Sequence, residues 1–74
     1  MTADPAFQKL TNLMGPTKAN EVYSDTLRRI GVSSLATPTD RYRFAIELMK
    51  HGGVLEHVGR AIKIQAILLG AKES

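Results

Sequence analysis

Glycine and proline divide this 74-residue chain into four segments, and this division limits its possible folds more than any other feature. The dividers are Gly15-Pro16, the stretch from Gly31 to Ala36, and Gly52-Gly53. Within each segment, apolar residues recur at every third or fourth position, which is the period of a helix and not of a strand. We therefore predict an all-α fold, a small four-helix domain with helices at about 4–14, 17–30, 38–51 and 54–69.

The chain is short enough to form only one core, because at this size only about 60% of the unfolded surface is buried on folding. We expect residues 1–74 to form a single helical domain with frayed ends at about 1–3 and 71–74. The chain has no cysteine, so stability must come from apolar packing or association. With no signal-sequence pattern and no apolar run approaching the roughly 20 residues of a membrane span, we expect a cytoplasmic protein without a transmembrane segment.

Capping residues predict where the third helix begins and where the second helix ends. Thr37 precedes the third helix, and Asp40 follows three positions later, an arrangement typical of a capped helix start. Gly31 follows the second helix, where a left-handed residue allows Val32 to fold back on Leu27. The start of the third helix and the end of the second are therefore each predicted from residues no more than five positions apart.

The third segment is apolar around more than half of its circumference, so we expect this helix at the centre with Phe44 buried. The second, third and fourth helices should form the core. The first segment has only a narrow apolar stripe, formed by Phe7, Leu10 and Met14, and we expect it to pack across the other three.

The fourth segment has more apolar residues than one core-facing stripe needs. Its predicted core stripe consists of Val54, Val58, Ala61, Ile62, Gln65 and Leu69. A second stripe contains Ile64, Ile67 and Leu68, which would form an apolar patch if they were left in water. Either the first helix covers this second stripe and the chain is a monomer, or another protein covers it.

We predict the second outcome: a non-catalytic protein-interaction module that self-associates as a homodimer, or binds a protein partner, through its C-terminal helix. Three apolar residues would anchor the interface, and three polar or charged residues would form its rim. The anchors are Ile64, Ile67 and Leu68, and the rim residues are His57, Arg60 and Lys63.

The alternative is a small basic nucleic-acid-binding protein, because the net charge is +3 and the pI is near 9.6. The segment from Phe44 to Lys63 has the helix–turn–helix order, although Leu48 is bulky where that motif prefers a small residue and Glu56 would repel phosphate. Arg29 and Arg60 each have an acidic residue one turn earlier, whereas Arg28, Arg41, Arg43 and Lys63 have no such predicted partner. The possible nucleic-acid contacts are Arg28, Arg41, Arg43, Arg60 and Lys63.

No arrangement of residues indicates an enzyme. The serines have no base at nucleophile spacing, no glycine-rich phosphate loop is present, and we assign no catalytic, cofactor-binding or metal-binding residue. Glu47 and His51 share a helix face, but a metal would need further convergent ligands, and His57 lies beyond the double glycine. The fourth helix could also lie on a membrane surface, yet its apolar and basic residues are not sharply separated.

Gly59 is unusual because it lies inside a predicted helix, where glycine costs about 1 kcal/mol relative to alanine. We expect the backbone of a neighbouring helix to pass close to it, with a mild kink as the alternative.

Overall fold

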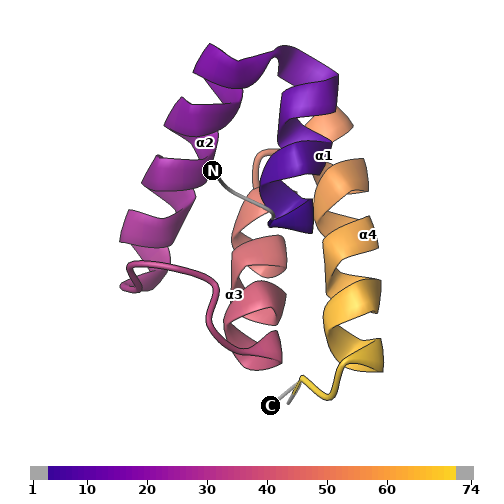
Figure 1. The fold of residues 1–74 in the computed structure, drawn as a ribbon. Coiled ribbons are helices and arrows are strands. Elements are labelled where there is room, and N and C mark those ends of the chain that lie inside the picture. Colours follow the sequence, from indigo (N-terminus) through magenta and orange to yellow (C-terminus); the bar gives the residue numbers. More distant parts are fainter. Residues whose placement is uncertain (1–3, 72–74) are drawn as a thin grey trace.

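The computed structural model describes residues 4–71, and within this range it contains four α-helices and no strand. The helices are α1 (Pro5–Met14), α2 (Pro16–Ile30), α3 (Pro38–Met49) and α4 (Gly53–Leu68) (Figure 1). The predicted all-α four-helix fold is therefore confirmed. The bounds agree within one residue, except that α3 ends two residues early, because the chain leaves the helix through Lys50 and His51 to reach Gly52.

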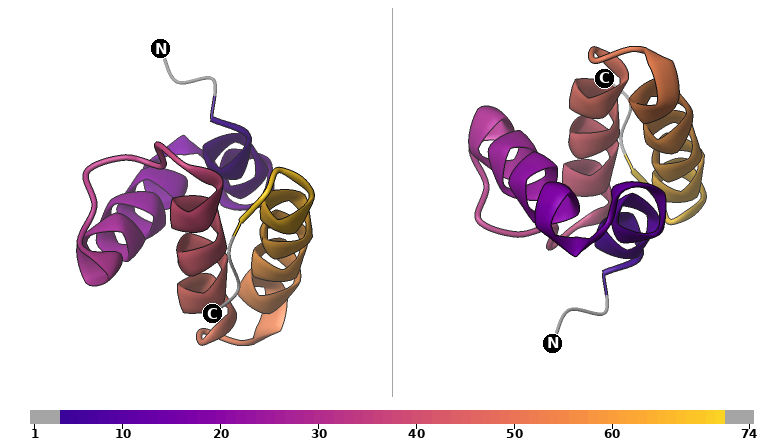
Figure 2. Two further views of the ribbon diagram at one scale, coloured as in Figure 1. Left: turned by 90° about the horizontal axis from the view of Figure 1, so that it is seen from below. Right: turned by 90° about the horizontal axis from the view of Figure 1, so that it is seen from above.

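α2, α3 and α4 lie in one row with α3 in the middle, and α1 lies across one face of that row (Figures 1 and 2). α3 and α4 run side by side in opposite directions, and α1 contacts both α2 and α4. This is the predicted arrangement of three core helices with the first packed across them.

α3 supplies the centre of the core. Phe44, Ala45 and Leu48 are completely buried, and α1 adds Leu10 from the opposite side. The Phe44 ring lies 5.3 Å from that of Tyr23 on α2, which connects the central helix to its neighbour through an aromatic pair. The expected burial of Phe44 and the central position of α3 are confirmed.

The predicted caps are present. The Thr37 hydroxyl accepts a hydrogen bond from the Asp40 N–H at 3.1 Å and so caps the start of α3. Gly31 is left-handed at φ 79°, and Val32 donates its N–H to the Leu27 carbonyl at 3.1 Å. The expected fraying at 1–3 and 72–74 lies outside the described residues, and Ala71 donates its N–H to the Ala66 carbonyl at 2.9 Å.

The predicted core stripe of α4 was partly wrong. The helix buries Gly59, Ile62 and Ala66, with Leu55 and Val58 packed beside them. The structure instead exposes four residues of the predicted stripe, namely Val54, Ala61, Gln65 and Leu69. The cause is that α3 packs closely against α4 at Gly59. The side of α4 that carries Gly59 and Ile62 therefore faces the core.

Gly59 itself confirms the expected close approach. A Cβ atom at this position would lie 2.8 Å from the carbonyl oxygen of Ala45 and 2.8 Å from Cγ of Met49, both on α3. Only a residue without a side chain therefore fits between the two helices at this distance.

Candidate interaction surface

The exposed large hydrophobic residues of the described chain gather on α4. Val54 is 55% exposed, Ile64 54% and Leu68 81%, and Leu69, which caps the helix, is 63% exposed. Among the described residues, the one other exposed large hydrophobic is Leu13 on α1. The surplus apolar residues of the fourth helix therefore remain in contact with solvent, although α1 packs against α2 and α4.

These residues lie on one face of the helix together with smaller and polar ones. Steps of three and four positions connect 54, 57, 61, 64 and 68, and at about 100° per residue such positions stay on one side of the cylinder. All of them are exposed. We call this surface the outer α4 face and define it as Val54, His57, Ala61, Ile64, Gln65 and Leu68.

The structure brings together some of the predicted interface residues and separates others. Ile64, Leu68 and His57 lie on the outer α4 face, whereas Ile67 and Lys63 are half-buried and lie off this face. Arg60 is exposed next to this face, and its Nη2 lies 2.9 Å from the Glu56 carboxylate, the predicted pair.

Sequence reasoning missed Val54, Ala61 and Gln65 as members of this face, because it assigned all three residues to the core stripe. The regular spacing of 54, 61 and 68 by seven residues was the available signal, since a seven-residue apolar repeat is typical of a helix that pairs with another helix.

A shallow apolar groove continues the outer α4 face at its C-terminal end. Pro5 of α1, Arg41 of α3 and the α4 end itself form its walls, the last through Gln65, Leu68 and Leu69. The apolar surface therefore extends from the helix onto the start of α1.

Next to this groove, Asp4 connects three helices. Its Oδ1 accepts a hydrogen bond from Arg41 at 2.8 Å and one from the Ala6 N–H at 2.9 Å, and its Oδ2 accepts one from the Tyr23 hydroxyl at 2.7 Å. Burial disfavours the charged form of Asp4, but these hydrogen bonds outweigh it and lower its pKa below the ordinary value. Burial and the bond to Asp4 raise the pKa of Tyr23. The start of α1 is thus attached to α2 and α3.

The proposed nucleic-acid contacts are dispersed and mostly engaged. Arg41 is bound to Asp4, Arg43 donates to the Ile30 carbonyl at 2.8 Å, and Arg28 lies 3.6 Å from the Asp25 carboxylate. The prediction that Arg28, Arg41 and Arg43 lack partners was therefore wrong. Arg41 and Arg43 find theirs on other parts of the fold, at Asp4 and Ile30.

The segment from Phe44 to Lys63 forms a helical hairpin. α3 and α4 lie antiparallel and side by side in every view, whereas the helices of a helix-turn-helix motif cross at about 90–120° (Figures 1 and 2). The bulky Leu48 is fully buried between them. In this hairpin the outer α4 face points away from α3 and carries mainly apolar residues.

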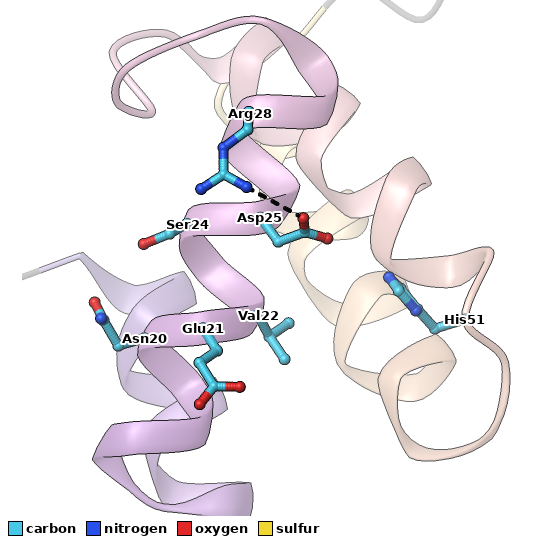
Figure 3. A pocket seen from close by; sticks show the side chains of 7 residues that line it. All are labelled: Asn20, Glu21, Val22, Ser24, Asp25, Arg28 and His51. Atoms are coloured by element: carbon cyan, nitrogen blue, oxygen red, sulfur yellow. Dashed lines mark ion pairs between the residues drawn. The ribbon is translucent and has the colours of Figure 1, made fainter.

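A polar hollow lies between α2 and the turn after α3 (Figure 3). Within it, Arg28 extends toward Asp25 and His51 lies on the opposite wall. Asp25 also accepts a 2.9 Å hydrogen bond from Arg29, and this bond, more than any other contact, lowers the Asp25 pKa. The hollow is thus a solvated helix surface whose central carboxylate is shared by two arginines.

Neither a metal site nor a membrane span is found in the part of the chain that the structure describes. No cluster of three or more His, Asp or Glu side chains is placed to hold a metal ion there, and Glu47 contacts Lys50 and Arg29. None of the helices in residues 4–71 combines the length and apolarity that crossing a bilayer requires.

Comparison of the chain with models of protein families, with curated proteins and with solved structures gave no significant match.

Proposed function

We propose that this protein is a non-catalytic protein-interaction module that self-associates through the outer α4 face. The observation that carries the proposal is the exposure of Leu68, at 81%, on the same helix face as Val54 and Ile64. Contiguous apolar surface of this kind marks interaction sites, because water disfavours it. A cysteine-free chain fits a reducing cytoplasm, where we place the protein as part of this proposal.

The magnitude of the apolar contribution suits a reversible pair. Fully burying a Val, Ile or Leu side chain contributes about 1.5–3 kcal/mol. Scaled by the exposed fractions of Val54, Ile64 and Leu68, burial of the outer α4 face contributes about 3–6 kcal/mol per copy. A symmetric dimer gains twice that amount, against an association cost of about 4–15 kcal/mol. We therefore expect an equilibrium between monomer and dimer that depends on concentration.

Sedimentation velocity over a wide range of concentrations, at low and at high salt, tests the proposal. We expect the average mass to rise from that of the 8.1 kDa monomer toward twice that value. High salt should preserve or strengthen the association, because apolar contacts are not screened. A monomer at every concentration would overturn the proposal.

Substitutions locate the contact. Ile64→Ser combined with Leu68→Ser should shift the equilibrium to monomer with the helical circular dichroism unchanged, because both side chains are already exposed. Leu13→Ser is the matched control, since Leu13 is an exposed apolar residue on a different helix. If the control weakens association as much as the double variant does, the contact is not confined to the outer α4 face.

The same samples test the nucleic-acid alternative. A gel-shift assay with random duplex and single-stranded DNA at low salt should show no retardation. Retardation that disappears steeply as salt rises would instead indicate phosphate contacts and would favour the alternative.

A further inference from the structure

We infer that two copies of this chain pair with their α4 helices antiparallel, about a twofold axis that passes beside Ala61. The inference rests on the proposed self-association and adds its geometry. It follows from the order of residues along the outer α4 face, where reversal about Ala61 pairs Val54 with Leu68 and His57 with Gln65.

Reversal about Ala61 places apolar residues opposite apolar ones. Val54 lies seven positions before Ala61 and Leu68 lies seven after it, so Val54 faces the partner's Leu68. By the same count, Ile64 reaches position 58 of the partner, where the half-buried Val58 packs against its own core. Each of these pairs occurs twice because of the twofold symmetry, which closes the assembly as a dimer.

Ala61 lies at the centre, where the two helices come closest. It has the smallest side chain on the outer α4 face and is exposed. The distance between packed helices, about 8–10 Å, depends on the side chains at the crossing, and small ones allow the shorter value. The larger side chains of Leu68 and Ile64 lie toward the ends of the contact.

The position of His57 favours the antiparallel direction. In a parallel pair His57 would face the partner's His57, so two bulky polar rings would meet inside an otherwise apolar contact. In the antiparallel pair His57 faces the partner's Gln65, a neutral amide, and lies about 12 Å along the axis from the partner's His57 at 1.5 Å per residue. The opposed helix dipoles also favour this direction.

The groove at the C-terminal end of α4 gives the pair additional surface. Because Leu68 forms part of that groove together with Pro5 and Leu69, the partner's Val54 comes to lie at its edge. The contact therefore extends beyond α4 to the start of α1, which a pair formed by the helix alone would not reach.

Single-cysteine variants of the full chain test the geometry, because the natural sequence contains no cysteine. A disulfide requires Cα atoms within about 7 Å, so cross-linking by an added oxidant such as diamide reports which positions face each other. Ala61→Cys should form a disulfide-linked dimer by itself. A mixture of Val54→Cys with isotope-labelled Leu68→Cys should give the mixed dimer in about tenfold excess over either like-with-like product, as mass spectrometry can measure.

Leu13→Cys is the off-face control and should remain uncrosslinked under the same conditions. Cross-linking of Val54→Cys to itself and of Leu68→Cys to itself would overturn the inference in favour of a parallel pair. If sedimentation shows a dimer but Ala61→Cys does not cross-link, the antiparallel geometry is wrong and self-association stands. If sedimentation shows only monomer, both the geometry and the proposed self-association are overturned.

Discussion

Replacing Gly59 by alanine is expected to destabilise the protein, although the same substitution stabilises an isolated helix. An alanine inside a helix is favoured over glycine by about 1 kcal/mol. The added Cβ, however, would lie 2.8 Å from the Ala45 carbonyl oxygen and 3.2 Å from Cβ of Leu48. These atoms belong to the central helix α3, so relief requires the two helices to separate.

The magnitude follows from the difference between these effects. The Met49 side chain, 2.8 Å from the added Cβ, can rotate away, but the carbonyl of Ala45 is part of the α3 backbone and cannot. Overpacking of a close-packed contact typically costs about 1–3 kcal/mol. Because this cost falls on an unyielding backbone atom, we expect it to exceed the propensity gain of about 1 kcal/mol and to lower the free energy of unfolding by up to about 2 kcal/mol. A loss of 1 kcal/mol lowers Tm by about 4–8 °C in a domain of this size.

Urea denaturation followed by circular dichroism measures the effect, at a protein concentration low enough to keep the chain monomeric. Ala61→Gly is the matched control on the same helix, because Ala61 is exposed and should lose about 1 kcal/mol through propensity alone. If Gly59→Ala is instead more stable than the natural protein by about 1 kcal/mol, helix propensity is the dominant effect and the close contact between α3 and α4 is refuted.

Two further predictions concern the core and the start of α1. Phe44→Ala should lower the free energy of unfolding by about 3–5 kcal/mol, enough to unfold much of a domain this small, and thermal denaturation should show a large loss of Tm. The pKa of Asp4 is lower in the folded protein than in the unfolded chain, so ionised Asp4 contributes to the stability of the fold. This stabilisation is present above the ordinary pKa of 3.8 and is lost as pH falls below that value. Asp4→Asn should therefore lower stability at neutral pH and flatten the acid limb of the stability profile, and an unchanged acid limb in urea titrations from neutral to acidic pH would contradict the role assigned to Asp4.

Part of the interaction surface could be predicted from the sequence. The surplus of apolar residues on the last helix was visible in the spacing of Ile64 and Leu68, and both are exposed. Val54 and Ala61 were placed in the core, because helical periodicity identifies residues that share a face but not which face meets the rest of the protein. The approach of α3 at Gly59 settles that question. Gly59 indicated a close neighbouring helix, but the glycine alone did not show which apolar stripe lies on the same side.

The sequence by itself determined where the helices of this protein begin and end, except at the end of α3. Thr37, Gly31 and the prolines act on backbone groups within about four residues of themselves, so their effect does not depend on the remaining fold. The tertiary structure decided which side of α4 is buried and joined Arg41 to Asp4, 37 positions away along the chain. Such contacts depend on how the helices pack around Phe44. That packing is set by how side chains distant in the sequence fit together, which local sequence patterns do not predict.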